Sequence, residues 1–112
     1  MKAFMPRKLL SAESVPSLVS ERLTIWGKAI RTQRVRQRMT ADQLCVRVGI
    51  SRATLSRIEQ GDAAVNVAGY MTAFLVLGIL DEAMPPLHPM LWSAHENGRV
   101  KARREEGADD YF

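Results

Sequence analysis

Residues Thr40 to Gly61 of the chain, TADQLCVRVGISRATLSRIEQG, contain the signals for two short helices joined by a tight turn. Thr40 and Gln43 form a T-x-x-Q capping box, which predicts that the first helix begins here. Gly49 suits the left-handed conformation that ends a helix, and Ser51 suits the N-cap of the next one. The stretch therefore predicts a helix-turn-helix arrangement.

The apolar residues of this stretch have the spacing of two helices packed on a common core. Those expected to face inward are Leu44, Cys45, Val48, Ile50, Leu55 and Ile58. Those left to point outward from the second helix are Arg52, Ala53, Ser56 and Arg57. In a helix-turn-helix the second helix enters the major groove of DNA, and its first residues contact base edges. The outward side chains are therefore candidates for DNA recognition.

Each candidate has a physical role at DNA. Arg52 is expected to pair with guanine, and the methyl groups of Ala53 and Thr54 are expected to rest against thymine. Arg57 suits a base or a phosphate, and the hydroxyls of Ser51 and Ser56 suit phosphate oxygens. Further positive charge along the backbone is expected from Arg31, Arg36 and Arg38. The alternative for each exposed arginine is a solvated surface charge.

The charge of the chain is unevenly distributed. Its 112 residues suffice for one domain with a modest core, and the net charge is +4. Residues 21–61 contain nine basic and three acidic residues, whereas residues 62–112 contain four basic and eight acidic residues. A polyanion suits the basic half, and a different partner suits the acidic half.

Three segments are expected along the chain. Residues 1–20 are predicted to be a mostly irregular leader, either disordered or a DNA-binding arm. Residues 21–80 are predicted to form the helical domain, and residues 81–112 a proline-rich extension with a charged tail. A turn is expected at 81–84, and a short helix at 90–97.

Two further helices are expected in the domain. The first runs from Glu21 to Met39, and its inner face is expected to carry Leu23, Trp26, Ile30 and Val35. Gly27 lowers helix propensity by about 1 kcal/mol, so close packing is expected there. Asn66 is expected to cap a later helix over residues 67–77. The residues expected to be buried on that helix are Tyr70, Met71, Phe74 and Leu77.

Catalytic and metal-binding patterns are missing from the sequence. His88 and His95 lack a cysteine or carboxylate companion at a familiar metal spacing. Cys45 is expected to fill the core rather than to act as a nucleophile or ligand. No apolar run is long enough to cross a bilayer, and residues 1–10 are too short and polar for a secretory signal. We expect a cytoplasmic, DNA-binding protein that is not an enzyme and uses no metal or cofactor.

The chain resembles the lambda-repressor-like, or Xre, family of bacterial helix-turn-helix regulators. The matching motifs are T-x-x-Q-L from Thr40, V-G-I-S from Val48 and S-R-x-T-L-S-R-I-E-Q-G from Ser51. The resemblance covers about Arg22 to Gly78 and implies an all-α fold with a five-helix domain. The sequence departs from the family at Ala41, where the family often has a phosphate-binding glutamine, and at Cys45, where alanine is usual.

The resemblance also implies an internal ion pair and an assembly. Arg34 and Glu59 are expected to form a partly buried pair that ties the first helix to the recognition helix, the alternative being two solvated charges. Members of the family usually form homodimers. A homodimer is therefore expected on an inverted-repeat operator of double-stranded DNA, with half-sites about 34 Å apart.

The whole chain is similar to HipB-like antitoxins, whose partners are HipA-like serine/threonine kinases. The similarity is based on the compact domain, on A-x-L-V-L-G-I-L-D at residues 73–81, and on a basic-then-acidic tail that ends in aromatics. It implies an antitoxin that neutralises a kinase toxin and represses its own operon. Trp92, Tyr111 and Phe112 are then candidates for partner binding. The alternatives are a stand-alone Xre-family regulator with a solvated tail, and an adaptor that has lost DNA binding.

Overall fold

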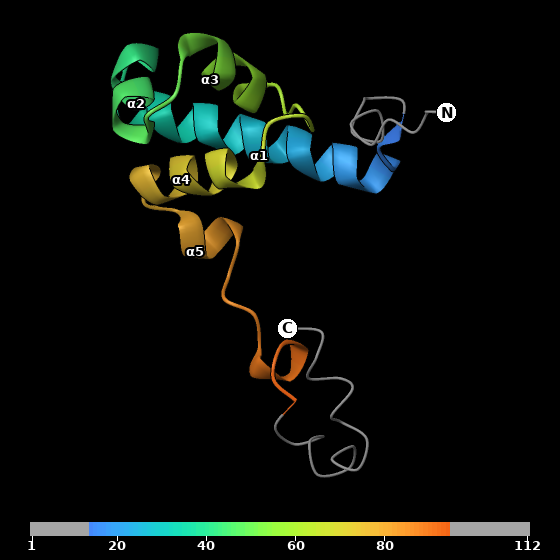
Figure 1. Ribbon diagram of the computed structural model, residues 1–112. Helices are drawn as coiled ribbons and strands as arrows, with labels where there is room; N and C mark the ends of the chain where they lie inside the picture. Colours follow the sequence, from blue (N-terminus) through green and yellow to red (C-terminus); the bar gives the residue numbers. More distant parts are fainter. Residues whose placement is uncertain (1–13, 95–112) are drawn as a thin grey trace.

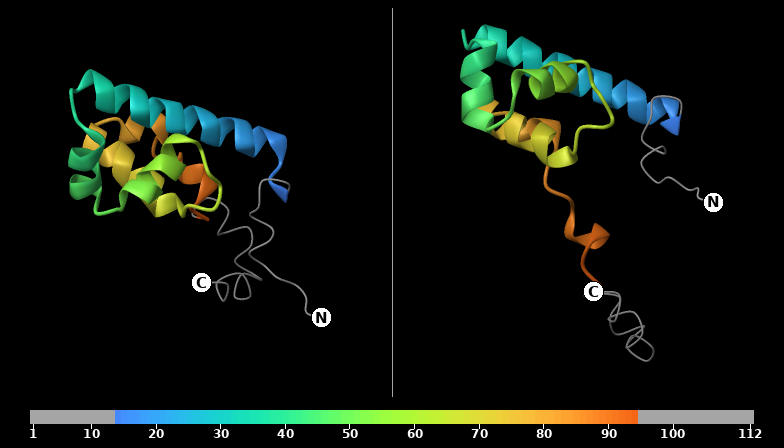
Figure 2. Two further views of the ribbon diagram at one scale, coloured as in Figure 1. Left: turned by 90° about the horizontal axis from the view of Figure 1, so that it is seen from above. Right: turned by 45° about the horizontal axis from the view of Figure 1, so that its top comes forward.

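The computed structural model describes residues 14–94, and all regular elements in this range are helices joined by loops. The elements are α1 (Ser17–Arg36), α2 (Ala41–Val48), α3 (Arg52–Glu59), α4 (Val67–Leu77), α5 (Leu80–Ala83) and the 3-10 turn η3 (Pro89–Leu91). In the view of Figure 1, α3 lies above the line of α1 and α4 lies below it, with α2 beside the C-terminal end of α1. In both views of Figure 2 the shorter helices lie on one side of α1. Within residues 14–94, the predicted all-α fold with five α-helices is confirmed.

The ends of α2 and the start of α3 have the local structure that their sequence predicts. The Thr40 hydroxyl accepts from the Gln43 N–H at 3.0 Å, and Gln43 Oε1 accepts from the Thr40 N–H at 2.8 Å, which completes the capping box. Gly49 ends α2 with a φ of 85°, a conformation that costs least without a Cβ. Ser51 Oγ accepts from a backbone N–H in the first turn of α3. Both ends of α2 and the start of α3 are therefore fixed by local interactions.

The first helix begins earlier than predicted. α1 begins at Ser17 rather than at Glu21, so residues 17–20 are helical and do not belong to an irregular leader. The missed signal is Pro16, whose ring restricts φ to values like the −56° found here. Its carbonyl accepts from the Ser20 N–H at 3.0 Å, which begins the helical hydrogen bonding.

The first helix also ends earlier than predicted, at Arg36 instead of Met39. Arg38 adopts a φ of 58°, which reverses the chain after the last helical turn. The Met39 N–H then donates to the carbonyl of Arg34 at 3.0 Å, and the Met39 side chain enters the core. The helix therefore ends where burial of Met39 requires a change of direction.

The core lies where α1, α2, α3 and α4 meet. Its buried apolar residues are Ile30, Met39, Leu44, Cys45, Leu55, Ile58, Tyr70, Ala73, Phe74 and Leu77. The predicted inner faces of α2 and α3 are confirmed, with Val48 and Ile50 packed partly buried against this core. The Trp26 ring lies 5.6 Å from that of Tyr70 and 5.7 Å from that of Phe74, which joins α1 to α4.

Gly27 is the point of closest approach between α1 and α3. A Cβ atom at this position would lie 2.6 Å from the carbonyl oxygens of both Ile58 and Glu59. These are backbone atoms, so no side-chain rotation makes room for it. The close packing expected at Gly27 is confirmed, and it sets the distance between the two helices.

The loop after α3 is held by Tyr70. Its hydroxyl donates to the carbonyl of Asp62 at 2.7 Å. Burial, together with the negative charge of Asp62, raises the pKa of Tyr70 to about 12. Asn66 Oδ1 accepts from the Gly69 N–H at 2.9 Å and caps α4, as predicted.

Two residues that were expected to be buried are exposed instead. Met71 is 40% exposed, and Ala73 occupies the buried position on α4. Val35 is 55% exposed, and its neighbour Arg34 is buried on α1. Ala73 lies three residues after Tyr70, and Arg34 lies four residues after Ile30, so both follow the helical spacing of the buried positions. The prediction favoured Met71 and Val35 for their apolar character instead.

The chain leaves the domain after α5, which forms at the turn predicted for 81–84. In place of the predicted helix at 90–97, the described residues form the single turn η3, where His88 Nδ1 accepts from the Met90 N–H at 3.0 Å. The exposed apolar residues of this extension are Leu87, Met90, Leu91 and Trp92. Predictions for leader residues 1–13, His95, the charged tail, Tyr111 and Phe112 lie outside the described residues.

Candidate nucleic-acid interface

Helix α3 has one buried side and one open side. Leu55 and Ile58 are 2% and 0% exposed and anchor the helix in the core. The exposed residues of the open side are Arg52, Ala53, Ser56 and Arg57, as predicted. The open side therefore carries polar and small side chains on a helix whose position is fixed by its apolar ones.

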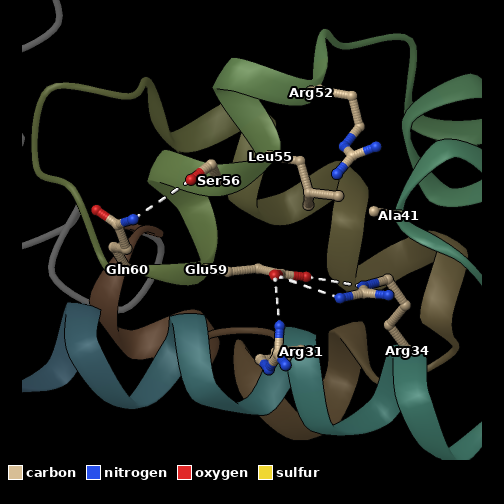
Figure 3. Close-up of a pocket in the computed structure, with 8 residues that line it drawn as sticks. All are labelled: Arg31, Arg34, Ala41, Arg52, Leu55, Ser56, Glu59 and Gln60. Carbon is tan, nitrogen blue, oxygen red and sulfur yellow. Dashed lines mark hydrogen bonds and ion pairs between the residues drawn. The ribbon is translucent and has the colours of Figure 1, made fainter.

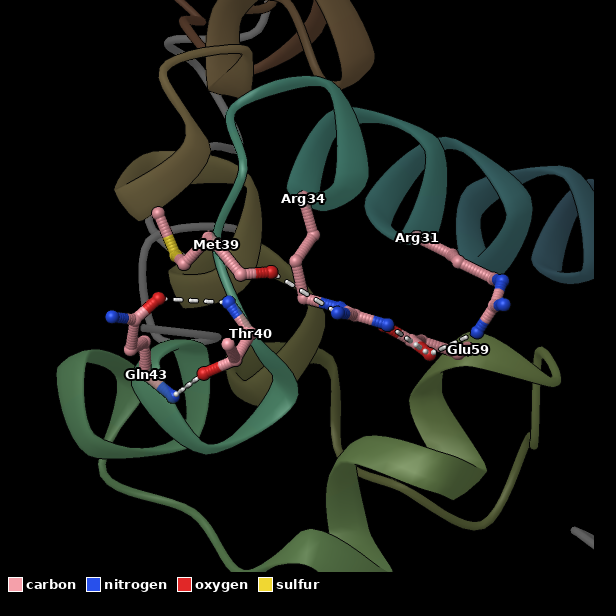
Figure 4. A network of polar contacts seen from close by, with 6 residues as sticks. All are labelled: Arg31, Arg34, Met39, Thr40, Gln43 and Glu59. Atoms are coloured by element: carbon pink, nitrogen blue, oxygen red, sulfur yellow. Dashed lines mark hydrogen bonds and ion pairs between the residues drawn. The ribbon is translucent and has the colours of Figure 1, made fainter.

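An ion pair fixes the end of α3 to α1. Arg34 Nε donates to Glu59 Oε2 at 2.8 Å, and Arg34 Nη2 donates to Oε1 at 3.4 Å. Arg34 Nη1 donates to the carbonyl of Met39 at 3.1 Å, so the guanidinium lies between the two groups (Figure 4). The side chains of Arg34 and Glu59 are only 10% and 12% exposed. The pair is therefore the partly buried one that the resemblance implies, and not two solvated charges.

A hollow of about 330 Å³ opens between α1, the start of α2 and α3. Figure 3 shows the Glu59 carboxylate between Arg31 and Arg34, with Arg52 extending from the start of α3. Arg31 Nη1 lies 3.6 Å from Glu59 Oε1, and the Arg31 side chain remains 65% exposed. Ala41 lines the same hollow and offers it no polar group. The structure thus brings the basic side chains of Arg31 and Arg52 to the same hollow beside α3.

A second hollow, of about 500 Å³, lies between α3 and the loop that follows it. Thr54 and Arg57 line it from α3, and Asp62 and Asn66 line it from the loop and the α4 cap. Thr54 is half-buried, whereas Arg57 is exposed. Among residues 14–94, Arg57 has no ion-pair or side-chain hydrogen-bond partner. Its guanidinium is thus available to an external anion or base.

The hydroxyl groups of α3 differ in availability. Ser51 Oγ accepts from the Thr54 N–H and donates to Thr54 Oγ1 at 3.1 Å, so its hydrogen is used within the cap. Ser56 Oγ accepts from Gln60 Nε2 at 3.3 Å, which leaves its own hydrogen free to donate. Ser56 is therefore better placed than Ser51 to donate to a phosphate.

Arg52 is paired across the turn with Asp42, a residue that the sequence analysis did not select. Arg52 Nη1 donates to Asp42 Oδ1 at 2.9 Å, and the two side chains are 65% and 75% exposed. This hydrogen bond and the nearby negative charge raise the pKa of Arg52 above its usual value. The pairing joins the starts of two different helices, so no helical spacing in the sequence indicates it.

Arg36 and Arg38 are not brought into either hollow. Arg36 is the last residue of α1, and Arg38 lies in the turn that follows it. Both are exposed. They add positive charge near the end of α1, and the structure does not place them with Arg31, Arg52 and Arg57.

The described part of the chain offers no metal site through its cysteine or its acidic and histidine residues. Cys45 is buried in the core, and burial raises the pKa of its thiol, as suits a core residue. No cluster of three or more potential metal ligands occurs among residues 14–94. None of the helices in this range combines the length and the apolar character needed to cross a membrane.

Comparison with known proteins identifies the motif. Residues 27–77 match the family model of a helix-turn-helix domain, a range that runs from the α1–α3 contact to the end of α4. No curated protein and no solved structure matches the chain. The helix-turn-helix match supports a DNA-binding regulator and agrees with the all-helical fold.

Proposed function

We propose that this chain, which carries a helix-turn-helix domain at residues 27–77, is a sequence-specific repressor of transcription whose helix α3 enters the major groove. The chief support is the open side of α3, where Arg57 is exposed and has no partner among the described residues. A guanidinium in that position can pair with guanine or neutralise a phosphate. The protein would act on double-stranded DNA in the bacterial cytoplasm, without a cofactor and not as an enzyme.

The exposed residues of α3 and α1 would contact different parts of the DNA. Arg52 and Arg57 would contact base edges or phosphates, and Ala53 would contact a thymine methyl. Ser56 would donate to a phosphate, since its hydroxyl hydrogen is free. Arg31 would contact the DNA backbone beside the α1–α3 hollow, and Arg36 and Arg38 would add longer-range attraction for the DNA phosphates.

Pairing of two copies is part of the proposal. An eight-residue helix such as α3 reads only a few base pairs, so a longer operator requires two of them. α4 exposes Val67, Met71 and Leu75 on successive turns, an apolar stripe that a second copy would cover. A symmetric dimer would then bind an inverted repeat with half-sites about one helical turn apart.

The recognition surface is tested by comparing Arg57→Ala with Arg47→Ala. Both variants lose one exposed arginine, but Arg47 lies in the last turn of α2 and lines neither hollow beside α3. Duplexes are first selected from a randomised pool with the wild-type protein, and affinities are then measured by fluorescence anisotropy. Arg57→Ala is expected to weaken binding to the selected site by about 1–3 kcal/mol, or roughly 5- to 150-fold.

Arg47→Ala is expected to change that affinity by no more than about threefold, as a peripheral charge does. The selected sequences should form an inverted repeat if two copies bind together. Equal affinities for wild type and Arg57→Ala would show that α3 does not face DNA. A single half-site in the selected pool would show that the protein does not bind as a symmetric pair.

We further propose that the regulator is an antitoxin, which binds a HipA-like kinase toxin and represses the operon that encodes both. Two features support this. The chain resembles HipB-like antitoxins, and its C-terminal extension exposes Leu87, Met90, Leu91 and Trp92. An exposed apolar group of this kind is typical of a protein-binding segment. The stand-alone regulator remains the competing function, because it needs no such partner.

Co-expression with the neighbouring gene product tests the antitoxin function. The wild-type chain should protect cells from that product and purify with it, and Trp92→Ala combined with Leu91→Ala should do neither. These substitutions lie outside the helix-turn-helix domain, so DNA binding should be retained. If the neighbouring product is harmless without the chain, or the double variant protects as well as wild type, the antitoxin assignment fails.

A further inference from the structure

The ion pair between Arg52 and Asp42 lies at the start of both helices of the motif. Arg52 is the first residue of α3, and Asp42 is the second residue of α2. Arg52 Nη1 and Asp42 Oδ1 are 2.9 Å apart. The caps of Thr40 and Ser51 fix the backbones that carry the two side chains. The carboxylate therefore has a defined position from which to hold the guanidinium.

Stability alone does not explain this pair. Both side chains are largely exposed, and an exposed ion pair contributes little to stability. An acidic residue at a surface that binds DNA also repels phosphates and lowers affinity for every sequence. A group with little effect on folding and an unfavourable effect on general affinity is understandable if it improves discrimination between sequences.

We propose that Asp42 is a positioning residue for base recognition, which holds the Arg52 guanidinium toward the bases and away from the phosphate backbone. The inference depends on the proposed DNA-binding function of α3. A free arginine side chain loses rotamer entropy when it is fixed, and Asp42 restricts it before DNA binds. One N–H is committed to Asp42, and the guanidinium keeps four others. These suffice for the bidentate contact to guanine O6 and N7.

The hollow beside α3 offers Arg52 a second direction in which to point. Arg52 and Arg31 line this hollow together, and the proposed function assigns Arg31 to the DNA backbone. Released from Asp42, the Arg52 guanidinium could turn to a phosphate, which carries no sequence information. Loss of Asp42 should therefore raise affinity for DNA in general and lower discrimination, two effects of opposite sign.

The experiment compares Asp42→Ala with Glu82→Ala, which removes an exposed acidic residue on α5 and changes the net charge equally. Anisotropy titrations use the duplex selected by wild type, the same duplex with its recognised guanine replaced, and a random-sequence duplex. Asp42→Ala should bind the random duplex about two- to fivefold more tightly. Its discrimination between the first two duplexes should fall about five- to tenfold. Glu82→Ala should leave that discrimination unchanged.

Two further variants separate positioning from charge. Asp42→Asn keeps an oxygen that can accept from Arg52, so it should retain part of the discrimination. In an Arg52→Ala background, Asp42→Ala should have no effect on discrimination, because there is no guanidinium to position. If Asp42→Ala tightens binding to all three duplexes equally, Asp42 acts only as a charge and the inference is wrong. If wild type prefers no sequence at all, the proposed function itself fails.

Discussion

Replacing Glu59 with alanine is expected to lower the free energy of unfolding by about 3 to 5 kcal/mol. The substitution leaves the Arg34 guanidinium buried without the carboxylate that it contacts at 2.8 and 3.4 Å. Only the hydrogen bond to the Met39 carbonyl would remain for this side chain. Small domains are stable by about 5 to 15 kcal/mol, so much of the native stability would be lost. Urea denaturation followed by circular dichroism at 222 nm measures the change.

Asp42→Ala is the matched control for the loss of Glu59. It also removes the carboxylate of an arginine pair, but this pair is exposed, so a much smaller change in the free energy of unfolding is expected than for Glu59→Ala. The double variant Arg34→Met with Glu59→Leu removes both buried charges, and it should be more stable than Glu59→Ala. If Glu59→Ala is no less stable than Asp42→Ala, burial of the pair does not govern its contribution.

Gly27→Ala is expected to lower the free energy of unfolding by about 1 to 3 kcal/mol, although alanine is the better helix former. The new Cβ would lie 2.6 Å from two backbone carbonyl oxygens of α3. Relief requires α1 and α3 to move apart, and this also lengthens the contact between Arg34 and Glu59. The steric cost should exceed the gain in helix propensity of about 1 kcal/mol. Thermal and urea unfolding of the variant measure the sum of the two effects.

Gly69→Ala provides the comparison, because Gly69 is also within a helix. Its Cβ would meet the Val65 Cγ1 atom at 3.3 Å, a side-chain atom that can move by a few tenths of an ångström. The helix propensity should then dominate, and the variant should be as stable as wild type or more stable by up to about 1 kcal/mol. Should Gly27→Ala behave like Gly69→Ala, the α1–α3 contact would be looser than its backbone distances indicate.

Glu59→Ala and Gly27→Ala should also affect function, because both act on the contact between α3 and α1. Glu59 is the last residue of α3, and Gly27 faces the carbonyl groups of its last turn. Displacement of this end would tilt the exposed side of the helix against a DNA groove. Reduced DNA affinity under conditions in which the variant remains folded would show that the attachment sets the orientation of the recognition surface.

Local sequence signals were enough to predict the parts of the fold that depend on neighbours within one or two turns. The capping box of Thr40, the left-handed Gly49 and the Ser51 cap involve only residues close in the chain, and all three are as predicted. The inner residues Leu55 and Ile58 follow from the helical period alone, so the opposite surface of α3 was also predictable. The pairing of Arg34 with Glu59 required the family resemblance, since 25 residues separate them.

Other features depend on contacts between separate helices, which only the tertiary structure shows. The burial of the charged Arg34 in place of the apolar Val35 depends on Glu59 of α3, which lies 25 residues away in the chain and supplies the carboxylate. Arg52 meets Asp42 because the turn brings the starts of α2 and α3 together. Arg36 and Arg38 lie away from the two hollows because α1 ends at Arg36 and the chain turns at Arg38. Local hydrogen bonds fix where helices begin and end, whereas packing between helices fixes which side chains share a site.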